Sequence, residues 1–168
     1  MKQILSPKLM RIIKNKAKLE EILNIKITNR GKEVNIQGTP EDEYVAEKVI
    51  DALNFGFKFI EAISITEEDR TFEIINIKDH TTKKDHNTIR SRIIGKEGKA
   101  LSTLESLGDC YIEVNGNSIG IIGNSTKIDN ITQAIISIIK GSKHSNVYCF
   151  LEKRQPKPIY DLGLRGQK

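Results

Sequence analysis

The stretch Arg92–Leu104, RIIGKEGKALSTL, decides how the rest of the chain is interpreted. At its centre is a Gly-x-x-Gly turn, Gly95-Lys96-Glu97-Gly98, between a short apolar segment and an apolar-periodic one. Glycine has no Cβ and tolerates positive φ, so the main chain of such a turn can lie very close to a ligand. The amides that start the following helix favour an anion, and Lys96 and Lys99 add positive charge. The turn is therefore predicted to hold a sugar–phosphate backbone.

Two other local structures share part of this pattern. A Gly-x-x-Gly turn can be a tight corner between two packed helices, and the turn by itself leaves that possibility open. A nucleotide-binding P-loop needs Gly five residues before its Gly-Lys pair and Ser or Thr after it, where this chain has Ile93 and Ala100. The flanks favour the nucleic-acid interpretation, because helical segments surround the turn and a hairpin signal, Asn115-Gly116-Asn117, precedes a long isoleucine-striped helix.

Composition narrows the function classes. The 168 residues include 27 Lys and Arg against 22 Asp and Glu, a net charge of +5, which suits a polyanionic partner such as RNA. Only 5% of residues are aromatic, so recognition is expected to use aliphatic surface and backbone contacts rather than rows of rings. Cys110 and Cys149 form no C-x-x-C motif, and neither a secretory leader nor a long apolar span is visible. These features predict a soluble cytoplasmic protein with free thiols.

The order β-α-α-β-β-α occurs twice. Arg11-Ile12-Ile13 aligns with Arg92-Ile93-Ile94 at an offset of 81 residues, and Gly31 aligns with Gly116 at an offset of 85. We interpret this as an internal duplication, with a length difference of about four residues placed between the helix pair and the hairpin. Each copy is near the lower size limit for an independent core. We therefore expect the copies to pack together, with Phe55, Phe57 and Phe59 at the seam.

The two copies differ in charge and in the predicted clamp. The first has Lys14-Asn15-Lys16-Ala17 where the second has Gly95–Gly98, so side chains would obstruct close approach of a backbone. Its last helix is acidic near its start. We predict a scaffold or protein-binding role for the first copy and RNA contact for the second, with contact between the first copy's lysines and RNA as the alternative.

The candidate RNA-binding residues surround the turn. Arg90 and Arg92 are predicted to contact phosphates, while Ile93 and Ile112 could either support a base or belong to the core. The full predicted set is Arg90, Arg92, Ile93, Gly95, Lys96, Glu97, Gly98, Lys99 and Ile112.

Catalytic and metal chemistry find little support in the sequence. His80, His86 and His144 do not have the spacing of a compact ligand set, and no nearby cysteine completes one. Asp109 and Glu113 form no recognisable acid–base or nucleophile relay. No enzyme activity, no metal and no cofactor are expected.

Residues 77–124, IKDHTTKKDHNTIRSRIIGKEGKALSTLESLGDCYIEVNGNSIGIIGN, resemble the second KH domain of a family of archaeal and eukaryotic small-ribosomal-subunit assembly factors. The segment IISIIKGSKHSNVYCFLEK, residues 135–153, is similar to the end of that family's last helix and tail. The resemblance extends from about Leu5 to Lys153. It implies that Gly95, Lys96, Glu97 and Gly98 form the clamp loop, and that the first KH-like domain lacks one. Glu97 departs from the commoner pattern, in which a basic or small polar residue would serve phosphate better.

The resemblance implies an α+β fold of two tandem type I KH-like domains, each with a three-stranded sheet and helices packed on one face. The expected boundaries are 1–65 for a degenerate domain without the loop, 66–150 for the KH domain with the loop, and 151–168 for a basic tail. The chain from His144 onward is expected to be poorly ordered.

The function implied is RNA binding in ribosome assembly without catalysis. The expected partners are single-stranded RNA near the 3′ end of small-subunit ribosomal RNA and the PIN-domain nuclease that trims it. A translation initiation factor is a further possible partner, and the chain is expected to be a monomer. The alternative is an adaptor that uses its KH-like surfaces to dock a nuclease or an initiation factor.

Overall fold

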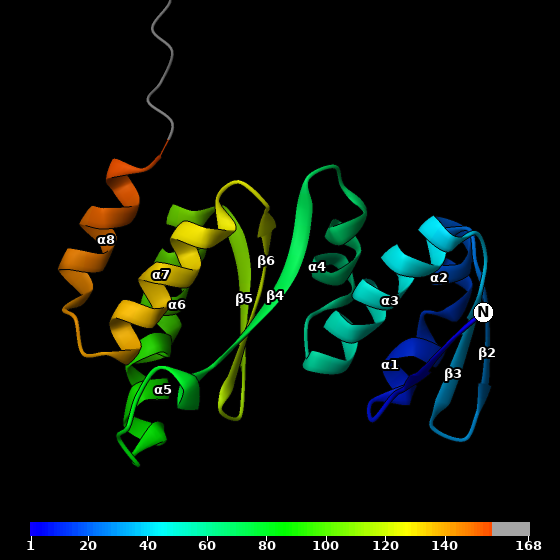
Figure 1. Ribbon diagram of the computed structural model, residues 1–168, viewed down its shortest axis with the longest axis horizontal. Coiled ribbons are helices and arrows are strands. Elements are labelled where there is room, and N and C mark those ends of the chain that lie inside the picture. The colour runs from blue at the N-terminus through cyan, green and yellow to red at the C-terminus, as the bar shows by residue number, and fades with distance from the viewer. Residues whose placement is uncertain (156–168) are drawn as a thin grey trace, which may run out of the picture.

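The computed structural model describes residues 1–155, which form two similar units joined by a short helical linker (Figure 1). The first unit consists of β1 (Lys2–Leu5), α1 (Leu9–Lys14), α2 (Lys16–Leu23), β2 (Lys26–Arg30), β3 (Glu33–Gln37) and α3 (Pro40–Phe55). The linker contains α4 (Phe59–Ile63) and the 3₁₀ turn η1 (Ser64–Thr66). The second unit consists of β4 (Arg70–Asn76), η2 (Ile77–Asp79), α5 (His86–Ile94), η3 (Lys96–Gly98), α6 (Lys99–Gly108), β5 (Cys110–Asn115), β6 (Ser118–Asn124) and α7 (Ile128–Ile139). A last helix, α8 (His144–Lys153), follows.

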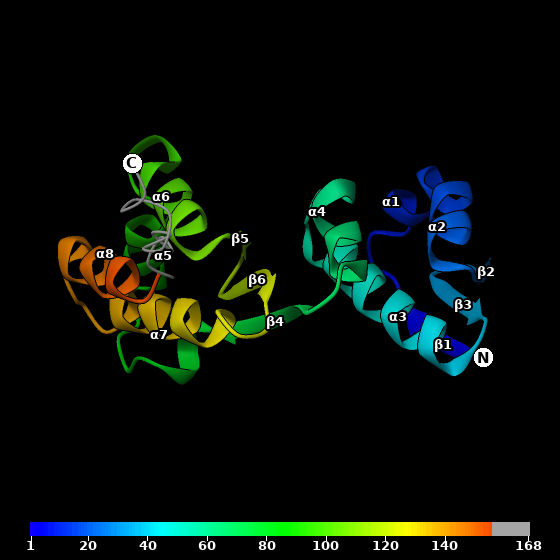
Figure 2. The same cartoon turned by 90° about the horizontal axis from the view of Figure 1, so that it is seen from above.

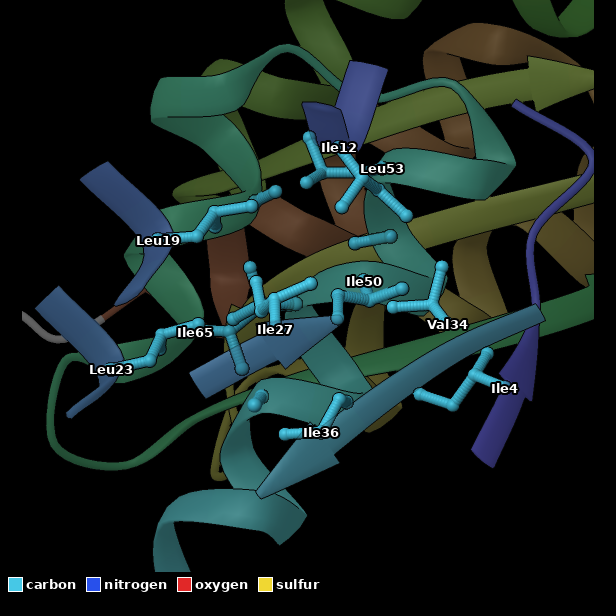
Figure 3. Close-up of a cluster of buried hydrophobic side chains, with 14 of the residues drawn as sticks. Ile4, Ile12, Leu19, Leu23, Ile27, Val34, Ile36, Ile50, Leu53 and Ile65 are labelled. Atoms are coloured by element: carbon cyan, nitrogen blue, oxygen red, sulfur yellow. The ribbon is translucent and has the colours of Figure 1, made fainter. Parts of the chain in front are cut away.

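Each unit has one antiparallel three-stranded sheet with its helices on one face. The strand orders are β1-β3-β2 and β4-β6-β5, so the last strand of each unit lies in the centre. The strands of each hairpin meet at a glycine in the left-handed region, Gly31 at φ +61° and Gly116 at φ +59°. In the first unit, isoleucine, leucine and valine side chains from the sheet and from α1 to α3 form the core (Figure 3). The predicted α+β fold of two type I KH-like domains is confirmed.

The duplication is visible in matching contacts at an offset of 85 residues. The backbone N–H of Ile27 donates to the carboxylate of Glu20 at 2.8 Å, and that of Ile112 donates to Glu105 at 2.9 Å. The end of the helix before each hairpin is also repeated, since Asn24 caps α2 and Asp109 caps α6, both in the left-handed conformation. The same bond therefore ties the helix to the edge strand in both units.

The four-residue length difference lies between the two helices of each pair, not between the helix pair and the hairpin as the sequence suggested. In the first unit α1 ends at Lys14 and α2 begins at Lys16, so a single residue, Asn15, joins them. In the second unit the whole Gly95–Gly98 turn stands between α5 and α6. The first copy therefore does not carry an obstructed version of the turn; it lacks the turn.

Aromatic rings hold the two units together. Phe72 of β4 meets Phe55 and Phe57, with ring centroids 5.9 and 5.6 Å apart. Gly120 of β6 lies against the same rings, and a Cβ there would come within 2.8 Å of both Phe55 and Phe57. The seam prediction is confirmed for Phe55 and Phe57, and Phe59 is half-buried against the first unit's core. One face of the second sheet therefore packs on the first unit, and its own helices cover the other face (Figures 1 and 2).

Polar contacts fix the linker at this seam. The guanidinium of Arg11 on α1 donates to the carbonyl oxygens of Gly56 and Phe57 at 2.9 and 3.1 Å. The side-chain amide of Asn115, in the second unit, donates to the carbonyl of Phe55 at 2.9 Å. Each unit thus donates to carbonyls of the segment Phe55–Phe57.

Helix α8 corrects the expectation of a poorly ordered segment from His144 onward. Val147 and Leu151 lie one turn apart and are buried against the second unit's core, with Tyr148 and Phe150 partly buried beside them. This apolar stripe stabilises the helix through Lys153, so the tail expected at 151–168 begins inside α8. Residues 156–168 of that tail lie outside the described residues.

Candidate nucleic-acid interface

Three of the four residues of the Gly95–Gly98 turn have positive φ. Gly95, Glu97 and Gly98 have φ values of +76°, +56° and +74°. A Cβ on Gly95 would lie 2.5 Å from the Cβ of Ala100, so glycine is required there for the turn to pack on α6. A Cβ on Gly98 would meet nothing within 4 Å. Gly98 therefore presents bare main chain to open space. Its positive φ favours glycine at this position, and the missing side chain leaves room for a ligand.

The turn lies on the surface. Lys96, Glu97 and Lys99 are exposed, and among residues 1–155 neither of these lysines forms an ion pair. The backbone N–H of Lys99 donates to the carbonyl of Lys96, and the N–H groups that follow it in the first turn of α6 have no intrahelical partner. Exposed main chain, free helical donors and two lysines therefore occur at one place.

Arg90 lies on α5 and reaches the β5–β6 hairpin. Its side chain is half-buried, and its guanidinium donates to the side-chain oxygen of Asn117 at a long 3.4 Å. Helix α5 itself begins at His86, because Asp85 accepts hydrogen bonds from the backbone N–H and the hydroxyl of Thr88. These bonds lower the pKa of the Asp85 carboxyl. Arg90 remains a candidate for phosphate contact.

Arg92 has a structural role that the sequence interpretation missed. Its guanidinium donates to the carbonyls of Ile138 and Ser142 at 2.9 and 2.6 Å, at the end of α7 and in the turn that follows. A ring nitrogen of His144 lies 2.6 Å from the carbonyl oxygen of Arg92. The donors of Arg92 are thus directed at main chain, which corrects the predicted phosphate contact. This role depends on contacts with residues 46 and 50 positions further along the chain, so no local sequence pattern could have indicated it.

The two ambiguous isoleucines belong to the core. Ile93 is 0% exposed and Ile112 is 3% exposed, and both pack in the second unit's apolar cluster. Their side chains do not reach the surface, so the expectation that they support a base is corrected.

Two half-buried carboxylates lie beside edge strand β5, and sequence reasoning did not identify them. Burial raises the pKa of Glu105 and of Glu113, and the nearby charge of Glu61 on α4 raises both further. For Glu105 the hydrogen bond from Ile112 acts in the opposite direction. The surface beside β5 therefore carries carboxyl groups, whereas the turn at Gly95–Gly98 carries two lysines.

Within residues 1–155, the structure contains no cluster of His, Cys, Asp and Glu that could hold a metal ion. In the same part of the chain, no helix has both the length and the apolar character needed to cross a membrane.

Two units with the order β-α-α-β-β-α, one of which carries an open Gly-x-x-Gly turn between its first two helices, define the class of KH-domain proteins. Residues 71–156 match the family model for the second KH domain of PNO1, described as the eukaryotic-type KH domain (KH-domain type I). The chain therefore belongs to the family of proteins with a PNO1-type KH domain.

Two sequence relatives support this assignment. A KH domain-containing protein of Methanocaldococcus jannaschii is 28% identical over 130 residues, which cover 74% of this chain and 57% of the relative. Pre-rRNA-processing protein pno1 of Aspergillus fumigatus is 28% identical over 154 residues, which cover 88% of this chain and 60% of the relative. This chain thus spans less than two thirds of the length of these relatives.

Solved structures show the same arrangement of both units. Dim2p of Pyrococcus horikoshii is 28% identical and superimposes with a TM-score of 0.83, covering 91% of this chain and 98% of that one. The same protein in a complex with a/eIF2alpha and rRNA gives a TM-score of 0.81 at 29% identity, covering 91% of this chain and 92% of that chain. The likeness therefore extends over both KH-like units.

Proposed function

We propose that this protein binds single-stranded RNA through the Gly95–Gly98 turn and acts, without catalysis, in assembly of the small ribosomal subunit. The observation that carries the proposal is the open main chain at Gly98 between two exposed lysines. KH loops of this kind hold the backbone of about four nucleotides.

The turn supplies three kinds of contact to a phosphate. The missing Cβ at Gly98 lets the sugar–phosphate chain touch the protein backbone. The N–H groups that follow Lys99 in the first turn of α6 donate to phosphate oxygens. Lys96 and Lys99 neutralise charge and make the affinity depend on salt. The negative charge of Glu97 disfavours contact between this side chain and a phosphate.

The names of the relatives support rRNA as the ligand that we propose. One is named for pre-rRNA processing, and the archaeal Dim2p has been crystallised with rRNA. By analogy, this chain would bind near the 3′ end of small-subunit rRNA, beside a PIN-domain nuclease that cuts there. It would act as a monomer in the cytoplasm, where subunits mature.

The first unit favours a second role, as a docking surface for protein. It lacks the loop, and Glu41, Asp42 and Glu43 fill the first turn of α3. A translation initiation factor is a candidate partner, because the Dim2p complex contains a/eIF2alpha. We also propose domain limits of 1–65 and 66–150, with α8 completing the second domain.

The RNA proposal is tested by changing the turn and measuring fluorescence anisotropy with a labelled fragment of the rRNA 3′ end. Lys96→Asp combined with Glu97→Asp should abolish binding with little change in the melting temperature, since both side chains are exposed. The chain provides a matched control, because Lys32 and Glu33 form the same exposed pair after Gly31 in the first unit's hairpin. Lys32→Asp with Glu33→Asp should keep wild-type affinity. Equal affinity in both variants would overturn the proposal.

A further inference from the structure

A polar recess of about 510 Å³ lies on the second unit, away from the Gly95–Gly98 turn. One side is formed by the chain between β4 and α5, and the other by the end of α7. The residues that line it are Lys78, Asp79, His80, Thr81, Thr82, Lys83 and Lys140. None of them belongs to the turn, α6 or β5, so the recess has no part in the clamp described above.

The charge of the recess favours an anion. Lys78, Lys83 and Lys140 are exposed, and none of them is in an ion pair within residues 1–155. Asp79 is the one acid in the lining, and Lys84 and Lys143 are exposed close by in the sequence. Three lysines and one carboxylate line the recess, so its net charge is positive.

The other lining groups identify phosphate as the suitable anion. The hydroxyl oxygen of Thr81 accepts the backbone N–H of Lys83 at 3.2 Å, which leaves its own proton free to donate. Thr82 and His80 add further polar groups, and no apolar side chain lines the recess. Ammonium and hydroxyl donors are groups with which proteins contact the phosphates of nucleic acid.

The fold connects the recess to the turn. The chain between α7 and α8 lines the recess through Lys140, and it is bound to α5 through Arg92, whose guanidinium holds the carbonyls of Ile138 and Ser142. Arg92 lies three residues before Gly95. Helix α5 has nine residues and is about 14 Å long, a distance that a few additional nucleotides span.

We propose that this recess binds backbone phosphates of RNA that extends beyond the nucleotides held by the Gly95–Gly98 turn. The inference rests on the proposed RNA-binding function and adds a second contact to it. Short RNA that fills only the clamp would not reach the recess, whereas longer RNA would contact both places.

The test compares a labelled RNA of about 5 nucleotides with one of about 15 in the full-length protein. Lys78→Glu with Lys83→Glu should weaken binding of the long RNA about tenfold or more and leave the short RNA unchanged. Loss of two phosphate contacts should also reduce the salt slope for the long RNA by about 1.4. Lys26→Glu with Lys32→Glu, exposed in the first unit, makes the same charge change and should affect neither RNA.

The possible results separate the two claims. If the long RNA loses no more affinity in the Lys78, Lys83 variant than in the control, the recess proposal is wrong. Equal losses for the short and long RNAs would also overturn it, because that result reflects net charge alone. The Lys96, Glu97 variant is measured beside it; if that variant still binds both RNAs, the clamp fails while the recess is judged on its own result. Melting temperatures, and Lys78→Gln with Lys83→Gln, identify any loss caused by misfolding.

Discussion

At the scale of single residues, the two glycines of the turn have different reasons for being glycine. Gly95 has ψ 177° at φ +76°, a conformation that is almost confined to glycine, and a Cβ there would collide with Ala100. Gly98 has ψ 11° at φ +74°, the ordinary left-handed region, with open space beside it. Sequence spacing identifies both as necessary, but only the structure separates packing from ligand access.

This difference predicts opposite phenotypes. Gly95→Ala should lower the free energy of unfolding by about 2–4 kcal/mol through steric overlap and backbone strain. Gly98→Ala should cost only about 1 kcal/mol, the penalty for a left-handed alanine, but should weaken RNA binding at least about tenfold. Urea unfolding and anisotropy measure the two effects.

Gly31 provides the control for this pair. It has φ +61° with nothing within 4 Å of an added Cβ, but it lies in the first unit's hairpin. Gly31→Ala should cost the same stability as Gly98→Ala and leave RNA affinity intact. An equal loss of RNA binding in both variants would contradict the assigned role of Gly98.

At the scale of elements, local sequence patterns predicted most of the helices and strands but not how they align between the two units or which of their faces are buried. The hairpin at Gly116 followed from turn chemistry, and the one at Gly31 followed from its alignment with Gly116. The missing turn in the first unit could not be located, because the apolar period continues from Ile12 to Leu19 across Asn15. Likewise, the burial of Ile93 and Ile112 depends on which side of α5 and of β5 faces the second unit's core.

The half-buried carboxyl of Glu105, which accepts the N–H of Ile112, makes stability depend on pH. Burial raises the pKa of Glu105 in the folded state, so its favourable contribution is present below its unfolded pKa and is lost as pH rises through the folded pKa. Glu105→Gln keeps an oxygen that can accept the N–H of Ile112 but carries no charge. We therefore expect its stability, relative to wild type, to improve from pH 4 to pH 7 in urea unfolding.

A control keeps the hydrogen bond separate from the charge. Glu105→Ala removes the acceptor as well, and should be less stable than Glu105→Gln at both pH values by about 1 kcal/mol. If the stability of Glu105→Gln relative to wild type is independent of pH, burial does not govern the ionisation of this carboxylate.

At the scale of the whole molecule, the seam makes one structure out of two small units. Phe72 and Ile122 of the second unit belong to the first unit's apolar cluster, and the linker carbonyls bind groups from both units. The sequence indicated that the copies should pack, because each is small, and it placed Phe55 and Phe57 correctly. It could not show that Gly120 makes room for these rings, since that requirement exists only once β6 is central in its sheet.

Filling this space should weaken the seam. Gly120→Ala places a Cβ 2.8 Å from the rings of Phe55 and Phe57, and should lower the free energy of unfolding by about 1–3 kcal/mol through overpacking. Ile60→Ala, at an exposed position of α4, should change it by less than about 0.5 kcal/mol. Equal stability of the two variants in urea unfolding would show that the rings are not tightly packed on β6.

The clamp is tested most directly by titrating single-stranded RNA from the rRNA 3′ end into ¹⁵N-labelled protein and following the backbone amides by NMR. We predict that the largest shifts occur from Lys96 to Ala100, where main chain is open and the α6 donors begin. Shifts confined to α1, α2 and α3, with the amides of that turn unmoved at saturation, would contradict the account and assign RNA contact to the first unit.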